Sequence, residues 1–85
     1  MTAPFLEMSF RHGRPFAAYL HCAPAQVARS SEMIGAGLVL DRAADGSVLG
    51  VEILDPRHAD VAVITASLAQ HGIAIMPADL APLAA

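Results

Sequence analysis

The stretch GAGLVLDRAADGSVLGVEILDP, Gly35–Pro56, decides the fold. Two apolar runs flank a polar turn that contains Asp45 and Gly46. Asp-Gly is a strong signal for a tight hairpin, because glycine accepts a positive φ without a steric cost. The stretch therefore predicts antiparallel strands near residues 38–41 and 48–54, with Gly46 in the turn at positive φ.

Apolar and polar residues alternate along both strands of this hairpin, and successive side chains of a strand point to opposite faces. The residues expected to face inward are Leu38, Leu40, Leu49, Val51 and Ile53. Those expected to face outward are Val39, Asp41, Gly50 and Glu52. A single apolar face is typical of an antiparallel sheet that is covered on one side.

Two earlier segments have the same alternation. Residues 5–10 place Leu6, Met8 and Phe10 on one face, and residues 16–22 form a second strand after the turn RHGRP. The short spacing predicts another antiparallel hairpin. Residues 27–34 form either a third strand or an irregular edge, since serines and glycines there disfavour a helix.

A helix is expected after the hairpin, over residues 57–71. Asp55 is a suitable N-cap, Pro56 is accepted at the first helical position, and Gly72 is a suitable residue just past the end. Residues 73–85 follow as an apolar tail, with a short extended piece and a possible helical turn from Pro77.

These elements predict a single small α+β domain over residues 1–85. Its sheet, at about residues 5–54, contains four or five antiparallel strands in a meander of hairpins, and one helix packs on one face. Turn or other structural roles are expected for Asp45, Gly46, Gly50, Asp55 and Pro56.

The composition predicts self-association. Hydrophobic residues make up 55% of the 85 residues, and charged residues only 15%. One sheet face is not expected to cover every apolar residue beyond position 60, and large exposed apolar patches are rare in soluble monomers. A two-fold homodimer is the commonest closed assembly. The interface candidates are Val61, Ile64, Leu68, Ile73, Ile75, Met76, Leu80 and Leu83.

Charge and hydropathy disfavour several partners. The net charge is −3, and the five arginines are scattered along the sequence, whereas nucleic-acid binding requires a concentrated basic face. No apolar run approaches the roughly 20 residues of a membrane helix, and no signal-peptide pattern is present. The single cysteine, Cys22, suits a reducing cytoplasm. We therefore expect a cytoplasmic protein that binds neither nucleic acid nor membrane.

No catalytic or metal-binding motif stands out, and no cofactor is expected. His12, His21, His58, His71 and Cys22 lack the spacing of a zinc site. Cys22 is interpreted as a core thiol, which stays protonated and unreactive. Ser30 and Ser31 lack a nucleophile motif. Asp41 and Glu52 could lie close together on the outer face, and an acid–base pair there is a minor alternative to a solvated sheet face.

The segment from Ala17 to Pro56 resembles the small proteins of the domain of unknown function 2283 family. The pattern D-G-x-x-x-G-x-E-I-L, Asp45 to Leu54, is the most specific part of the likeness. Ala17, Tyr19 and Leu20 suit the family's first strand motif, and Val27, Ser30 and Glu32 suit its second. The basic turn RHGRP replaces the family's usual acidic turn. The likeness implies the fold. Some members of the family are encoded beside small toxin-like ribonucleases, and this association implies an antitoxin or partner role as a second interpretation.

Three hypotheses follow for the function. The first is a non-enzymatic α+β domain that acts as a homodimer. The second is an acidic subunit that neutralises a small basic protein, because charge complementarity suits such a pair. The third and least favoured is a small hydrolase or metal-binding protein.

Overall fold

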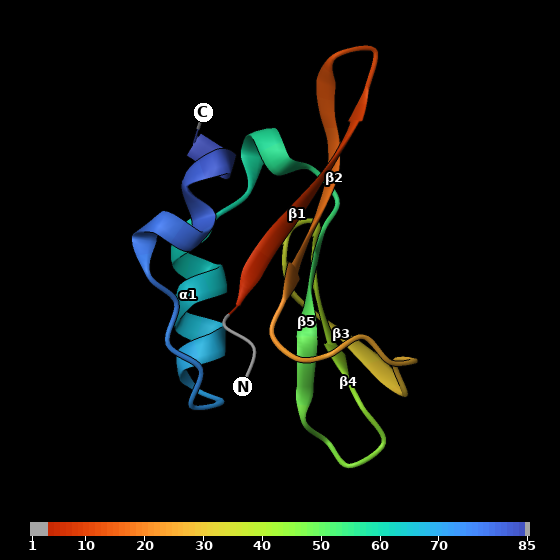
Figure 1. Cartoon of the computed structure of the whole chain (residues 1–85). Coiled ribbons are helices and arrows are strands. Elements are labelled where there is room, and N and C mark those ends of the chain that lie inside the picture. Colours follow the sequence, from red (N-terminus) through yellow and green to blue (C-terminus); the bar gives the residue numbers. More distant parts are fainter. Residues whose placement is uncertain (1–3, 85) are drawn as a thin grey trace.

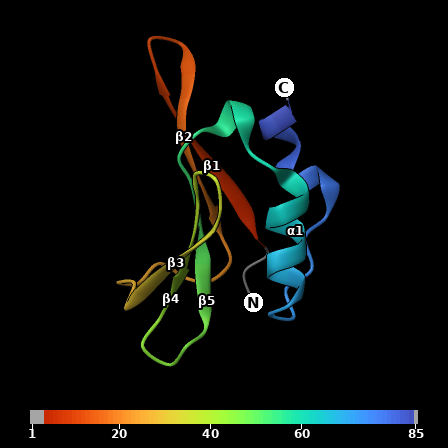
Figure 2. The ribbon, with the colours of Figure 1, turned by 180° about the vertical axis from the view of Figure 1, so that it is seen from behind.

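The computed structural model describes residues 4–84, in which five strands form one antiparallel sheet (Figure 1). The strands are β1 (Phe5–Arg11), β2 (Arg14–His21), β3 (Ser30–Gly35), β4 (Leu38–Arg42) and β5 (Val48–Ile53). Helical segments follow in the sequence and pack on one side of the sheet (Figures 1 and 2). The predicted α+β fold is confirmed.

The strand order is β1-β2-β5-β4-β3, so the predicted meander is wrong at one connection. β2 pairs with β5, and residues 22–29 carry the chain to β3 at the far edge. The burial of the strands gives the physical reason. Five of the six residues of β5 are buried, which suits the centre of the sheet, whereas β3 is largely exposed and suits an edge. Val27, expected near the start of β3, precedes that strand and is exposed.

The β4–β5 hairpin forms as predicted, except that Leu49, expected to face inward, lies outside the core cluster and lines a pocket with Tyr19 and His21. Gly46 has φ 87°, and its N–H donates to the carbonyl oxygen of Ala43 at 2.9 Å. The Asp45 carboxylate accepts hydrogen bonds from the N–H and the hydroxyl of Ser47, at 2.9 and 2.6 Å. These bonds to Ser47 lower the pKa of Asp45. An irregularity between Asp41 and Arg42 then shifts the register of the hairpin.

The helix is shorter than predicted. Instead of one helix over residues 57–71, the chain forms a 3-10 turn, η1 (Pro56–His58), and then the helix α1 (Val61–Ala69). Asp55 precedes η1 without making a side-chain cap bond. Ala59 is extended, with ψ 132°, and interrupts the helical path. The carboxylate of Asp60 accepts a hydrogen bond from the N–H of Val63 at 3.2 Å, so Asp60 is the N-cap of α1.

Gly72 ends the helical path as expected. Its φ is 75°, in the left-handed region that favours glycine. The N–H of Ile73 donates to the carbonyl of Leu68 at 2.9 Å, and that of Gly72 donates to the carbonyl of Ala69 at 3.0 Å. This bond pair is a Schellman motif. The chain then returns along the sheet, and the 3-10 helix η2 (Pro77–Ala84) starts at the expected Pro77.

The core lies between the sheet and this helical layer. Strand residues Ala18, Leu20, Leu38, Leu40, Val51 and Ile53 pack with Ile64, Leu68 and Leu80. Leu6 and Met8 lie at its margin, but Phe10, expected on the same face, is exposed. The reason is that the β1–β2 hairpin projects beyond the helical layer (Figure 1).

Most of the apolar residues proposed for a dimer interface pack within the chain itself. Ile64, Leu68 and Leu80 are buried in the core, and Ile73, Ile75 and Leu83 pack against it. Only Val61 and Met76 are among the exposed large apolar residues. One sheet face therefore covers more of the apolar residues beyond position 60 than was predicted from the sequence. An interface on that segment stays a prediction, and it would rest on Val61 and Met76.

Candidate functional site

The face of the sheet opposite α1 and η2 carries the candidate site, and we call it the open face (Figure 2). Residues paired directly across strands point to the same side of a sheet. One row across the sheet is Phe5, His21, Gly50, Asp41 and Ser31. The next row is Glu7, Tyr19, Glu52, Val39 and Met33. The register thus gathers ionisable and aromatic side chains that are dispersed in the sequence.

Asp41 is the centre of this face. The sequence predicts an outward and solvated residue, but Asp41 is only 5% exposed. One carboxylate oxygen accepts a hydrogen bond from the hydroxyl of Ser31 at 2.6 Å, and the other accepts one from the hydroxyl of Tyr19 at 3.1 Å. These bonds satisfy a carboxylate that would otherwise be costly to bury.

Tyr19 is held over the backbone of Gly50. A Cβ at Gly50 would lie 2.5 Å from a ring carbon of Tyr19 and would also collide with the carbonyl oxygen of Leu20. Only glycine therefore lets the ring approach β5 and reach Asp41. Burial and the neighbouring Asp41 carboxylate raise the pKa of Tyr19, so its hydroxyl remains a proton donor at neutral pH.

Glu52 completes this cluster. The pKa of Glu52 is raised. The largest cause is that the protonated Glu52 carboxyl can donate a hydrogen bond to Asp41, and burial and the like charge of Asp41 add to it. The structure thus brings together the two carboxyl groups that the sequence places on the outer face of the hairpin. The Asp41 cluster consists of Tyr19, Ser31, Asp41 and Glu52.

An aromatic group lies beside the Asp41 cluster. His21 stacks on Phe5 with ring centres 4.5 Å apart, and its ring is tilted towards Tyr19 at 4.7 Å. The Nε2 atom of His21 lies 2.8 Å from a carboxylate oxygen of Glu7. A pocket of about 280 Å³ adjoins this group, lined by Tyr19, His21, Ala23, Pro24, Ala25, Gln26 and Leu49.

The remaining candidate ligands and nucleophiles do not converge. His58 pairs with Asp55 at 2.9 Å, and His12 lies at the tip of the β1–β2 hairpin. Over residues 4–84 there is no group of three or more His, Cys, Asp or Glu side chains that could hold a metal ion. Burial raises the pKa of Cys22 to about 11, so its thiol is protonated at neutral pH. Ser30 makes no side-chain hydrogen bond in the described part of the chain, whereas the hydroxyl of Ser31 donates to the carboxylate of Asp41.

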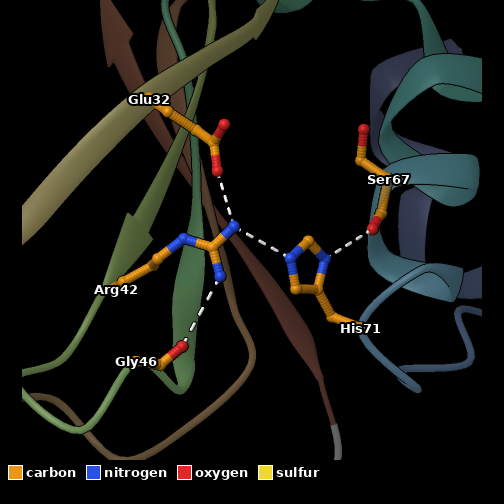
Figure 3. Close-up of polar contacts among 5 residues, drawn as sticks. All are labelled: Glu32, Arg42, Gly46, Ser67 and His71. Carbon is orange, nitrogen blue, oxygen red and sulfur yellow. Dashed lines mark hydrogen bonds and ion pairs between the residues drawn. The ribbon is translucent and has the colours of Figure 1, made fainter.

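A second polar network lies near the β3 edge of the sheet, where Arg42 on β4 connects β3 to the end of α1 (Figure 3). Its guanidinium pairs with Glu32 on β3 at 2.5 Å and donates to Nε2 of His71 at 2.9 Å. Nδ1 of His71 in turn donates to the carbonyl of Ser67 at 2.8 Å. Nothing in the sequence signals this network, because its members are up to 39 positions apart.

Comparison with known families identifies the segment that contains the Asp41 cluster. Residues 17–56 match the model of the family described as "Protein of unknown function (DUF2283)". This segment is therefore similar to that family. Comparisons with curated proteins and with solved structures found no match.

The DUF2283 segment includes the whole Asp41 cluster and the glycine beneath Tyr19. It excludes β1 and α1, and with them Phe5, Glu7 and His71. The likeness inferred from the pattern of Asp45 to Leu54 is thus confirmed. The family description assigns no activity, and no helix among the described residues is long and apolar enough to cross a bilayer.

Proposed function

We propose that this protein is a non-enzymatic binding domain that self-associates as a homodimer through the open face of its sheet. The main support is that the helical layer leaves this face uncovered while apolar side chains stand at its two edges. Phe5 on β1 is 50% exposed and Met33 on β3 is 69% exposed. Two sheets that pack face to face would bury both residues, as sandwich folds do within one chain.

The charges of the open face suit a second copy better than a basic partner. Two of its carboxylates already have partners within the chain. Glu7 pairs with His21, and Asp41 is bound by Ser31 and Tyr19, while the raised pKa of Glu52 beside Asp41 disfavours its charged form. Internal pairing reduces the repulsion between two identical faces, whereas a surface built for a basic protein would present free carboxylates. We also propose a cytoplasmic location, which the single thiol Cys22 supports.

The experiment is light scattering on the full-length protein at micromolar concentration. The wild type should be a dimer. Phe5→Glu and Met33→Glu would bury unpaired charges, and each should weaken the dimer by at least about tenfold. Val61→Glu and Met76→Glu are matched controls, because they place the same charge at exposed apolar positions on the helical side.

Two outcomes would overturn the proposal. A wild-type monomer would exclude self-association and favour the second hypothesis, an acidic subunit for a basic protein. A dimer that is broken by Val61→Glu or Met76→Glu, but not by Phe5→Glu or Met33→Glu, would place the interface on the C-terminal segment instead.

A further inference from the structure

A basic hollow of about 420 Å³ lies at the projecting end of the β1–β2 hairpin. It is lined by Arg11, His12, Arg14, Pro15, Phe16 and Arg57. Arg57 comes from η1, which follows the sheet in sequence but lies near this hairpin in space (Figure 1). The fold therefore brings together three of the five arginines, which are scattered along the sequence.

These three arginines have no ion-pair partner within residues 4–84, in contrast to Arg42, which pairs with Glu32. Asp55, the carboxylate nearest to Arg57 in sequence, is engaged with His58. The guanidinium of Arg11 lies 4.3 Å from the centre of the Phe16 ring. This stacking holds the charged plane in place while its N–H groups stay free to donate.

The hairpin turn places like charges together at a cost to stability. Arg11 and Arg14 are direct cross-strand partners, an arrangement in which like charges destabilise a sheet. Between them His12 has φ 52° and Gly13 has φ 75°, as in a type I′ turn. A left-handed histidine adds backbone strain. No carboxylate among the described residues pairs with Arg11 or Arg14 to offset the charge repulsion, and a bound anion would do so.

We propose that this hollow binds the phosphate group of a small phosphorylated molecule. Guanidinium groups form paired hydrogen bonds with phosphate oxygens, and three such groups match a dianion better than a single carboxylate. The volume of about 420 Å³ leaves room for an organic group beside the phosphate. A nucleic-acid backbone is disfavoured, because it requires basic residues along a track, and the basic residues here are confined to one hollow in a chain of net charge −3.

This site uses none of the open-face residues, so it is independent of the proposed dimer. The test is titration of the full-length, ¹⁵N-labelled protein at low ionic strength with inorganic phosphate, phenyl phosphate and acetate. Both phosphates should shift the amide signal of Gly13 and the Nε–H signals of Arg14 and Arg57. Phenyl phosphate should bind more tightly than inorganic phosphate, and acetate at least about tenfold more weakly.

Arg14→Gln and Arg57→Gln should each weaken phenyl phosphate binding by at least about tenfold. Arg29→Gln is the matched control, since Arg29 is exposed but lies outside the hollow, and it should leave the affinity unchanged. The spectra also report whether each variant stays folded. Absence of phosphate-dependent shifts at the hairpin, or an equal loss in Arg29→Gln, would overturn the site. A short single-stranded oligonucleotide that binds the same residues more tightly than phenyl phosphate would overturn the small-molecule assignment.

Discussion

Arg42 and His71 are 29 positions apart in the sequence, yet the guanidinium of Arg42 donates to Nε2 of His71 at 2.9 Å. Because Nδ1 of His71 donates to the carbonyl of Ser67, Nε2 is the unprotonated atom and accepts the bond. This contact joins the edge of the sheet to the end of α1 without an apolar residue. It therefore ties the end of α1 to β4 by a polar contact in addition to the apolar core.

The contact predicts a measurable coupling between the two side chains. His71→Ala should lower the free energy of unfolding by about 0.5–1.5 kcal/mol, because it removes two exposed hydrogen bonds, to Arg42 and to Ser67, each of which contributes little. Arg42→Ala should cost more, because Arg42 also pairs with Glu32. A double-mutant cycle measured by urea unfolding should give a coupling of about 0.5 kcal/mol or more. Strictly additive effects would show that the contact does not stabilise the fold.

The turn of the β4–β5 hairpin gives a second prediction. Gly46→Val should lower the free energy of unfolding by about 1 kcal/mol or more, since a β-branched residue adopts a positive φ only at a cost. Ala44→Val is the control, because Ala44 is an exposed residue of the same turn whose φ is not positive. A melting temperature that is equal in the Gly46 variant and the wild type would contradict this role of the turn.

The β4–β5 hairpin was predictable because its signals are local. The alternation of Leu38 and Leu40 and the Asp45-Gly46 turn act within a few residues of one another. The start of α1 was not predictable, since Asp55 and Asp60 are both suitable caps. The choice between them depends on how the chain leaves β5 and packs on the sheet. The pairing of β2 with β5 likewise depends on which strand is most deeply buried, and no local pattern encodes it.

The candidate sites depended still more on long-range contacts. Proximity of Asp41 and Glu52 follows from strand alternation within one hairpin, and the sequence predicts it. The burial of Asp41 does not follow, because it requires Tyr19 from β2 and Ser31 from β3. The basic hollow was missed for the same reason. Arg57 is far from Arg11 and Arg14 in sequence, and only the packing of η1 beside the projecting hairpin brings them together.

The close approach of Tyr19 to Gly50 gives a third prediction. Gly50→Ala should lower the free energy of unfolding by about 1–3 kcal/mol, because the new methyl group collides with the Tyr19 ring and with a backbone carbonyl that cannot move away. Gly46→Ala is the matched control. It has no atom within 4 Å of the added Cβ, so it measures the cost of a positive φ alone. A Gly50 variant as stable as the wild type would mean that Tyr19 does not lie over the strand.

The reactivity of Cys22 gives a fourth prediction. Burial raises the pKa of its thiol to about 11, and only the thiolate is nucleophilic. Alkylation by iodoacetamide at neutral pH should therefore be at least about tenfold slower in the folded protein than in denaturant. Mass spectrometry at timed intervals measures both rates. Equal rates would show that the thiol is exposed and ionises as it does in the unfolded chain.

The raised pKa of Glu52 predicts how stability depends on pH. A carboxyl group with a higher pKa in the folded state binds its proton more tightly there than in the unfolded chain. Its contribution to stability is therefore favourable in acid and is lost as the pH rises from the ordinary range of a glutamate through the raised pKa. Glu52→Gln removes this loss, so the variant should be more stable than the wild type at neutral pH. The difference should shrink as the pH falls below about 5.

Urea unfolding across this pH range measures the difference in stability between the Glu52 variant and the wild type. Glu7→Gln is the control, since that change removes a pair with His21 and should not stabilise the protein. A Glu52 variant that is less stable than the wild type at neutral pH would show that Asp41 and Glu52 do not repel each other in the folded state.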